Sequence, residues 1–121
     1  MGWFSNSVTN RKLNWTAITS VEELNDFLAQ SDKPLVLFKH STRCSISSMA
    51  LNSLENDWQL DSDAVHLGFI DLIQYRAVSN FCAEHLNVQH QSPQLILVDN
   101  GLVKYHTSHQ GIQYDDLIKQ L

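Results

Sequence analysis

One cysteine, Cys44, stands between an apolar run and an amphipathic segment, a position that suits a nucleophile. The apolar run, residues 35–38, is typical of a short buried strand. After it, apolar residues recur at positions 46, 50, 54 and 58, which is the spacing of one helix face. A cysteine in the first turn of a helix faces unpaired N–H groups and the positive end of the helix dipole. Because that placement lowers a thiol pKa from about 8.5 toward about 3.5–7.5, we predict that Cys44 is a nucleophile.

Several residues near Cys44 are candidates to stabilise its thiolate, to carry a proton or to cap the helix. Arg43 and His40 are both candidates to stabilise a thiolate through positive charge, and Arg43 stays charged near neutral pH. His40 is equally a candidate proton carrier, or a hydrogen-bond partner for the end of the strand. Ser41 and Thr42 are candidate helix caps, which would also fix the loop. The alternative to all these roles is an inert cysteine that only begins a helix.

The composition indicates a single acidic domain. The chain has 121 residues, of which 43% are hydrophobic, enough for one core. A net charge of −5, with no basic cluster larger than Arg11-Lys12, disfavours binding to nucleic acid or to anionic membranes. No apolar run approaches the roughly 20 residues of a membrane span, and none follows the signal-peptide pattern. We therefore expect a soluble, cytoplasmic protein whose two cysteines are free thiols.

Hydrophobic periodicity divides the rest of the chain into strands and helices. Ser20 and Glu23 have the spacing of a capping box, which predicts a helix start. Asn100-Gly101 predicts a tight hairpin, because these residues tolerate the positive φ angles that such turns require. In chain order, the predicted elements are a weak strand over 14–19, a helix over 21–30, a strand over 35–38, a helix over 44–59, a strand over 64–72, a helix over 75–85, strands over 94–98 and 102–107, and a helix over 112–121.

This order of elements indicates the fold class. Strands separated by helices favour parallel neighbours, and the hairpin adds an antiparallel pair. The thioredoxin fold has the same order, so we predict an α/β, thioredoxin-like domain over residues 13–121. Its central sheet is expected to be mixed, with four to five strands flanked by helices on both faces. Residues 1–12 are predicted to form a flexible N-terminal arm.

Thioredoxin-fold proteins carry their redox motif where Cys44 stands, at the junction of a strand and a helix. Here the motif is Cys44-Ser45-Ile46-Ser47, in which Ser47 takes the place of a second thiol. A local dithiol–disulfide cycle is therefore impossible. Cys44 would instead attack a disulfide sulfur and remain in a mixed disulfide until a further thiol resolves it. This is the chemistry of a monothiol glutaredoxin-like transferase.

Two further segments are predicted to form the ligand groove. Proteins of this fold typically carry a cis proline just before their fourth core strand, facing the redox cysteine. Ser92-Pro93 directly precedes the strand over 94–98, so we predict a cis bond there, although most X–Pro bonds are trans. In glutaredoxin-like proteins the groove also borders the junction of the last strand and last helix. Thr107 and Ser108 stand at that junction.

The remaining cysteine and the nearby histidines suggest no metal site. His106 and His109 flank the junction after the last strand, and their role is left open. A site shared with Cys44 is conceivable, but the spacing matches no standard zinc pattern. Cys82 lies on an apolar helix face, so we predict a small core residue. Pairing of Cys82 with Cys44 would require Cα atoms within about 7 Å, which neighbouring elements of this fold seldom allow.

Taken together, these segments resemble the YtxJ-type monothiol bacilliredoxin family. The similarity runs from about Trp15 to the C-terminus and is carried by residues 38–47, 79–81, 90–94 and 104–109. The family is associated with bacillithiol, a low-molecular-weight thiol that some bacteria use in place of glutathione. The resemblance implies that Cys44 removes bacillithiol from S-thiolated client proteins, with bacillithiol as co-substrate, no bound cofactor, and Pro93 opposite the sulfur. The sequence departs from the family where a proline commonly follows the cysteine, because Ser45 stands there.

Two alternative functions belong to other classes. Some monothiol glutaredoxins hold an iron–sulfur cluster between two subunits by a C-x-x-S cysteine and an external thiol. This chain lacks the glycine and phenylalanine that are usual inside that motif. The second alternative is a binding module that uses the thioredoxin groove without catalysis.

Overall fold

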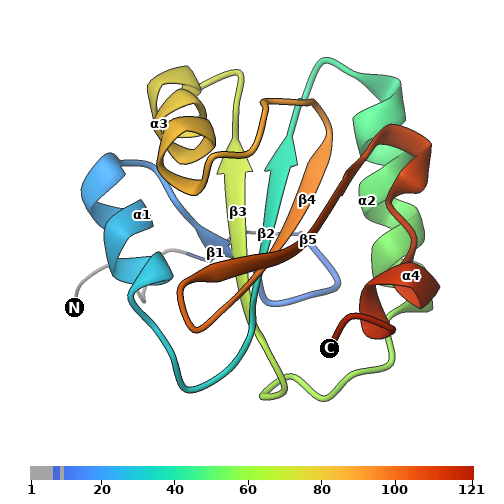
Figure 1. Ribbon diagram of the computed structural model, residues 1–121. Helices are drawn as coiled ribbons and strands as arrows, with labels where there is room; N and C mark the ends of the chain where they lie inside the picture. Colours follow the sequence, from blue (N-terminus) through green and yellow to red (C-terminus); the bar gives the residue numbers. More distant parts are fainter. Residues whose placement is uncertain (1–6, 9) are drawn as a thin grey trace.

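A five-stranded mixed sheet forms the centre of the structure, a computed structural model that describes residues 7, 8 and 10–121 (Figure 1). The strand order is β1-β3-β2-β4-β5, with β1, β3 and β2 parallel, β4 antiparallel to β2, and β5 antiparallel to β4. The strands are β1 Thr16–Ala17, β2 Leu35–His40, β3 His66–Asp71, β4 Gln94–Asp99 and β5 Leu102–Ser108. This arrangement confirms the predicted thioredoxin-like α/β fold.

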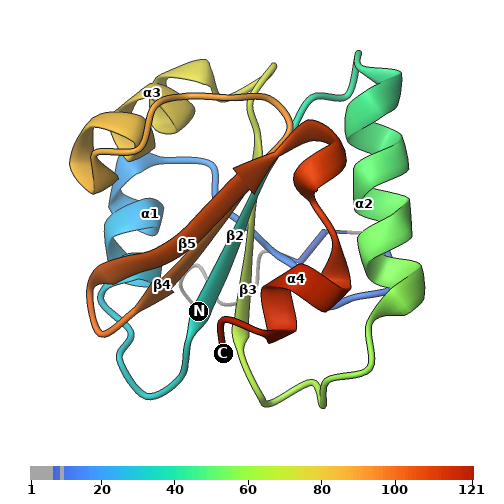
Figure 2. The same ribbon diagram turned by 45° about the vertical axis from the view of Figure 1, so that its right-hand side comes forward.

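Helices cover both faces of the sheet (Figures 1 and 2). One layer holds α1 Val21–Leu28 and α3 Arg76–Leu86, and the other holds α2 Ser45–Asp57 and α4 Tyr114–Ile118. A short 3-10 helix, η2 His109–Gly111, connects β5 to the segment before α4. Among the described residues, no helix combines the length and the apolar character needed to cross a membrane.

β2 is buried along its whole length because it lies between two other strands and between the two helical layers. Val36 and Phe38 pack toward α2 and α4, whereas Leu35 and Leu37 pack toward α1 and α3. The strand continues two residues past the predicted 35–38, because pairing with β3 extends to its last residue. Two polar residues after the apolar run therefore belong to the sheet.

Two predicted local signals, a helix start and a hairpin turn, are confirmed. Ser20 is the N-cap of α1, and its hydroxyl accepts a hydrogen bond of 3.1 Å from the Glu23 N–H. The Glu23 carboxylate in turn accepts the Thr19 N–H at 2.7 Å. At the β4–β5 hairpin, Asn100 and Gly101 have φ angles of 53° and 79°. Both angles are positive, as tight hairpin turns require.

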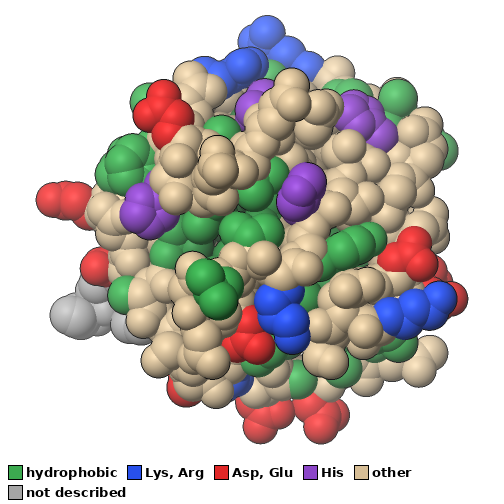
Figure 3. Space-filling view, viewed as in Figure 1, with side chains coloured by type: hydrophobic (Ala, Val, Ile, Leu, Met, Phe, Trp, Pro, Cys, Tyr) green, Lys and Arg blue, Asp and Glu red, His purple; other side chains and the backbone are tan. Residues whose placement is uncertain are grey.

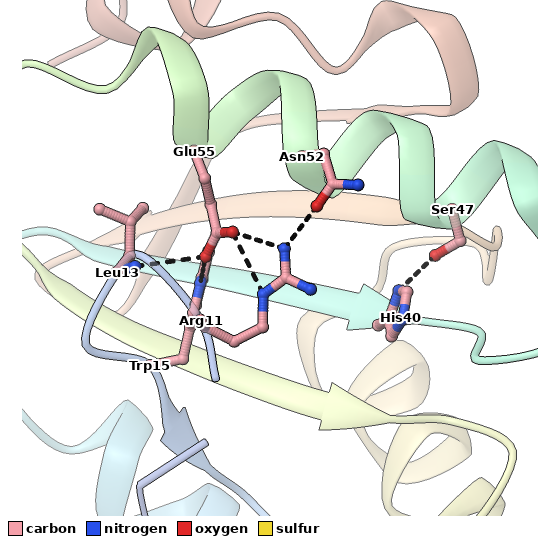
Figure 4. Close-up of polar contacts among 7 residues, drawn as sticks. All are labelled: Arg11, Leu13, Trp15, His40, Ser47, Asn52 and Glu55. Carbon is pink, nitrogen blue, oxygen red and sulfur yellow. Dashed lines mark hydrogen bonds and ion pairs between the residues drawn. The ribbon is translucent and has the colours of Figure 1, made fainter. Parts of the chain in front are cut away.

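The described part of the N-terminal segment contacts the domain through a buried carboxylate (Figure 4). Glu55 on α2 accepts hydrogen bonds from Arg11 at 2.5 and 3.1 Å and from the Trp15 indole at 2.7 Å. Burial raises the pKa of Glu55, but the bonds from Arg11, Trp15 and the Leu13 N–H outweigh burial and hold this pKa below its ordinary value. The prediction of a flexible arm also covers residues 1–6 and 9, which lie outside the described residues.

Candidate active site

Three connecting segments meet at one edge of the sheet (Figure 1). Because β4 is antiparallel to β2 and β5 is antiparallel to β4, the end of β2, the start of β4 and the end of β5 lie together. Lys39 pairs with Gln94, and Gln94 pairs with Ser108. The His109 N–H donates to the Pro93 carbonyl at 3.2 Å. The segments predicted to carry the nucleophile, the proline and the ligand groove therefore share one edge.

Cys44 is the N-cap residue of α2, with φ −114° and ψ 118°. Cys44 is half-buried, unlike the fully buried Cys82. The Cys44 N–H donates to the Ser41 carbonyl at 3.2 Å, which closes the turn between strand and helix. The prediction that Ser41 or Thr42 caps the helix is wrong, because Cys44 is the N-cap residue and its own side chain makes no capping hydrogen bond. The N–H groups of the first turn therefore remain beside the sulfur.

Ser47, the last residue of the motif, is fully buried and held from two sides (Figure 4). Its hydroxyl accepts the Ser41 N–H at 3.0 Å and shares a hydrogen bond of 2.7 Å with His40 Nδ1. Burial lowers the pKa of His40, Arg11 lowers it further, and Asp71 opposes them. The imidazole is therefore neutral at neutral pH, and it does not supply the positive charge considered for it. His40 instead anchors Ser47 at the end of β2.

The Ser92–Pro93 peptide bond is cis, which confirms the prediction. Pro93 is buried and Ser92 is half-buried. The loop that carries them begins at Asn87, whose left-handed backbone ends α3. The Gln94 side-chain amide donates to the Gln89 carbonyl at 3.0 Å and ties the loop to the start of β4. These contacts hold Pro93 at the edge of the sheet where β2 ends and leads into Cys44.

The segment after β5 turns sharply into η2. Thr107 and Ser108 are half-buried at the strand end, while His106 is exposed. His109 has a left-handed backbone, with φ 54°. Gly111 packs so closely that an added Cβ would overlap the Thr107 hydroxyl, so a larger residue here would require the Thr107 side chain or η2 to shift. Within the described part of the chain, no group of three or more His, Cys, Asp or Glu residues is arranged to hold a metal ion.

A cavity of about 210 Å³ lies between the first two turns of α2 and the η2 segment. Its lining includes Ile46 and Met49 from α2 and His109 and Gln110 from η2. Ile46 is 39% exposed and Met49 is 70% exposed. The helix periodicity places Ile46 on the buried face, and the structure differs because this first turn faces the short η2 segment instead of the sheet. Apolar surface is therefore open next to the nucleophile.

Positive side chains lie at the edge that carries Cys44, although the net charge of the chain is −5. β2 and β3 are parallel, so the residues that follow both strands lie at the same edge. Arg43 follows β2, Arg76 begins α3 after β3, and both are exposed. Figure 3 shows a group of Lys and Arg side chains at the top of the view, while side chains of both charges are scattered over the rest of this face. Exposed guanidinium groups stay charged and attract anions, including thiolates.

The model of the family described as monothiol bacilliredoxin BrxC matches residues 16–117. This chain belongs to the monothiol bacilliredoxin family. The matched residues run from β1 into α4 and include Cys44, Ser47 and Pro93. Membership makes the protein a thiol oxidoreductase with a thioredoxin-like fold.

Solved structures of low sequence identity share the fold of this bacilliredoxin. A protein with a thioredoxin fold is 24% identical, with a TM-score of 0.75, and the match covers 86% of this chain and 90% of that one. Thioredoxin from Trypanosoma brucei brucei is 17% identical, with a TM-score of 0.67 and coverage of 93% and 97%. Mitochondrial thioredoxin 3 from Saccharomyces cerevisiae is 20% identical, with a TM-score of 0.66 and coverage of 87% and 91%.

The second thiol of the bacilliredoxin, Cys82, is a core residue, as predicted. It is fully buried between the sheet and the α1/α3 layer, whereas Cys44 begins a helix of the opposite layer. Burial raises the pKa of Cys82 to about 11, and the opposing effect of Lys39 is smaller. The Cys82 thiol therefore stays protonated at neutral pH and is a poor nucleophile.

Sequence reasoning missed a buried polar contact next to the proline loop. Lys39, in β2, is fully buried. Its Nζ lies 3.4 Å from Nδ1 of the His90 imidazole. The only signal in the sequence is a lysine that directly follows a continuous apolar run.

Proposed function

We propose that this bacilliredoxin removes bacillithiol from the mixed disulfides of S-thiolated client proteins, with Cys44 as the nucleophile. The observation that carries the proposal is a half-exposed cysteine at the start of α2 whose motif partner, Ser47, is a buried hydroxyl. A single accessible thiol suits transfer through a mixed disulfide. We place the reaction in the cytoplasm, where thiols are kept reduced.

In the first step, the Cys44 thiolate attacks the bacillithiol sulfur of a modified protein. The disulfide between protein and bacillithiol breaks, the protein thiolate leaves and takes up a proton, and a disulfide forms between Cys44 and bacillithiol. The free N–H groups at the start of α2 favour the attacking anion. Exposed Arg43, the neighbouring residue, adds positive charge.

In the second step, free bacillithiol resolves the intermediate from outside. Its thiolate attacks the bacillithiol sulfur, which releases Cys44 and oxidised bacillithiol disulfide for a separate reductase. An outside thiol is required, because Ser47 has no sulfur and buried Cys82 packs on the other side of the sheet. We propose Ser92, Pro93, Thr107 and Ser108 as the walls of the groove that receives the thiol.

Ser45 is the residue that bears on the identity of the thiol. It is the first residue of α2 and is exposed beside Cys44. A proline at this position has no N–H, whereas Ser45 adds one backbone donor and one hydroxyl near the sulfur. Bacillithiol and glutathione must therefore be compared directly.

The test uses one model protein whose single cysteine carries either bacillithiol or glutathione. With free bacillithiol present, the wild type should release bacillithiol, and Cys44→Ala should lower the rate by about 100-fold or more, because it removes the nucleophile. Mass spectrometry before resolution should find one bacillithiol on Cys44.

Cys82→Ala is the matched control, since it removes the other thiol, and it should retain the rate within about twofold. Equal release rates for the wild type and Cys44→Ala would contradict the proposal. Release of glutathione alone would keep thiol exchange but contradict bacillithiol as the co-substrate.

A further inference from the structure

Lys39 is a lysine with no solvent exposure in the central strand of the protein. It lies on the α1/α3 face, which Leu35 and Leu37 of the same strand share. Its Nζ donates to the Ser79 carbonyl at 3.1 Å and lies 3.4 Å from His90 Nδ1. The Ser79 hydroxyl lies 3.3 Å from His90 Nδ1 as well. β2, α3 and the loop after α3 therefore meet at one amine.

The loop that Lys39 reaches is the one that carries the cis proline, and we call residues 87–93 the proline loop. Gln94, which follows this loop, is the cross-strand partner of Lys39, so their side chains share one face. Gln94 is also buried, its amide donates to the Gln89 carbonyl, and its Oε1 has no hydrogen-bond partner among the described residues. Two buried polar side chains of adjacent strands thus bond to the proline loop.

Packing does not account for a lysine at this position. Burial lowers the pKa of Lys39, with Cys82 opposing, because the charged amine loses its hydration. An apolar side chain of similar size is often at least as favourable in such a place. The preceding residues of β2, 35–38, are all apolar. The gain from Lys39 must therefore lie in the hydrogen bonds that it makes.

We propose that Lys39 is a positioning residue that holds the proline loop, through His90, against the strand that leads to Cys44. This inference rests on the thiol exchange proposed above. The end of β2 leads directly into the turn of Cys44, and the loop bonded to Lys39 ends at Pro93. One side chain thus sets the separation of nucleophile and proline. Removing the Lys39 amine leaves Cys44 in place but lets the proline loop, and Pro93 with it, move.

The contact also depends on the protonation of His90. Nδ1 accepts an N–H from Lys39 only while it carries no proton itself. Burial, followed by the charges of Lys39 and Arg76, lowers the pKa of His90 from its ordinary value of 6.5. The contact is therefore intact at neutral pH and is lost only in acid, below 6.5. Arg76 and Cys82 on α3 are the charged and titratable groups that face this pair, and the paired residues of β3 and β4 do not titrate.

The experiment compares Lys39→Met and His90→Gln with the wild type, and Lys119→Met serves as an exposed control. Three readouts are measured: kcat/KM for bacillithiol release, hydrogen exchange of residues 87–93, and the rate of Cys44 alkylation by iodoacetamide. Lys39→Met should lower kcat/KM by about 10- to 100-fold, because a displacement of Pro93 by about 1 Å misaligns the bound disulfide with Cys44. It should also speed exchange in the loop while alkylation stays within about twofold.

His90→Gln provides the second arm. Its amide oxygen can accept from Lys39 and does not titrate, so activity at neutral pH should persist. As the pH falls below 6.5, the loss of activity should be smaller than in the wild type, because glutamine does not take up the proton that His90 takes up in acid. If Lys39→Met does not fold, the pH profile of His90→Gln alone tests whether the contact between Lys39 and His90 positions the loop.

Two results would overturn the inference. One is wild-type kcat/KM together with wild-type loop exchange in Lys39→Met. The other is a pH profile of His90→Gln that superimposes on that of the wild type. If the wild type releases no bacillithiol, the proposed function fails, while the loop exchange of Lys39→Met still tests the positioning role on its own.

Discussion

Replacing Glu55 by glutamine should destabilise the protein by about 3 kcal/mol at neutral pH. The carboxylate accepts bonds from Arg11, Trp15 and the Leu13 N–H. Glutamine keeps one oxygen and turns an NH₂ group toward the remaining donors. Trp15 is fully buried, so an indole N–H without a partner costs about 1–3 kcal/mol. The side chain of Arg11 is 24% exposed and can turn to water, so loss of the ion pair adds only about 1 kcal/mol.

Urea unfolding at neutral pH measures this difference, and an unchanged m-value shows that the same surface unfolds. The melting temperature should fall by roughly 10 °C for a domain of this size. The native pKa of Glu55 is lowered from 4.5, so its stabilisation is present above pH 4.5 and is lost as pH falls through the native pKa. The wild type and Glu55→Gln should therefore converge in acid.

Glu84→Gln on α3 is the matched control, because this carboxylate is exposed. Its effect should stay within about 0.5 kcal/mol. A loss below about 1 kcal/mol in Glu55→Gln, or a difference that persists at acid pH, would refute the reasoning. Either result would mean that the N-terminal segment does not depend on this carboxylate.

Two further predictions concern the site. Gly111→Ala should lower the free energy of unfolding by about 1–2 kcal/mol through overlap with the Thr107 hydroxyl, and a smaller loss in a Thr107→Ala background would trace the effect to that contact. Equal losses in both backgrounds would argue against it. Ser47→Cys should let the new thiol attack the mixed disulfide on Cys44, forming an internal disulfide and releasing bacillithiol without added free thiol. Mass spectrometry that still finds the adduct on Cys44 would contradict this.

The fold could be predicted because its signals are local. The capping box of Ser20 and Glu23 marks a helix start, and Asn100-Gly101 marks a hairpin, through bonds and angles of neighbouring residues. The order of strands and helices then limited the topology. The place of Pro93 before β4 followed from that order, and its cis bond agrees.

The electrostatics of the site could not be predicted in the same way, because they depend on residues far apart in the sequence. His40 sits in a motif where a positive charge is plausible, but burial and distant Arg11 keep it neutral. Lysine is almost never fully buried, so the predicted strand stops at Phe38, one residue before Lys39. Its partners Ser79 and His90 become neighbours only once α3 has packed on the sheet.

The alternation of side chains along β2 limits how the length of this protein can change. Phe38 packs in the α2 layer, Lys39 bonds into the α3 layer, and His40 returns to Ser47 on α2. Substitutions can alter each layer separately. A single inserted or deleted residue within the strand would exchange the two faces, so that the amine met Ser47 and the imidazole met Ser79. β2 must therefore keep its number of residues.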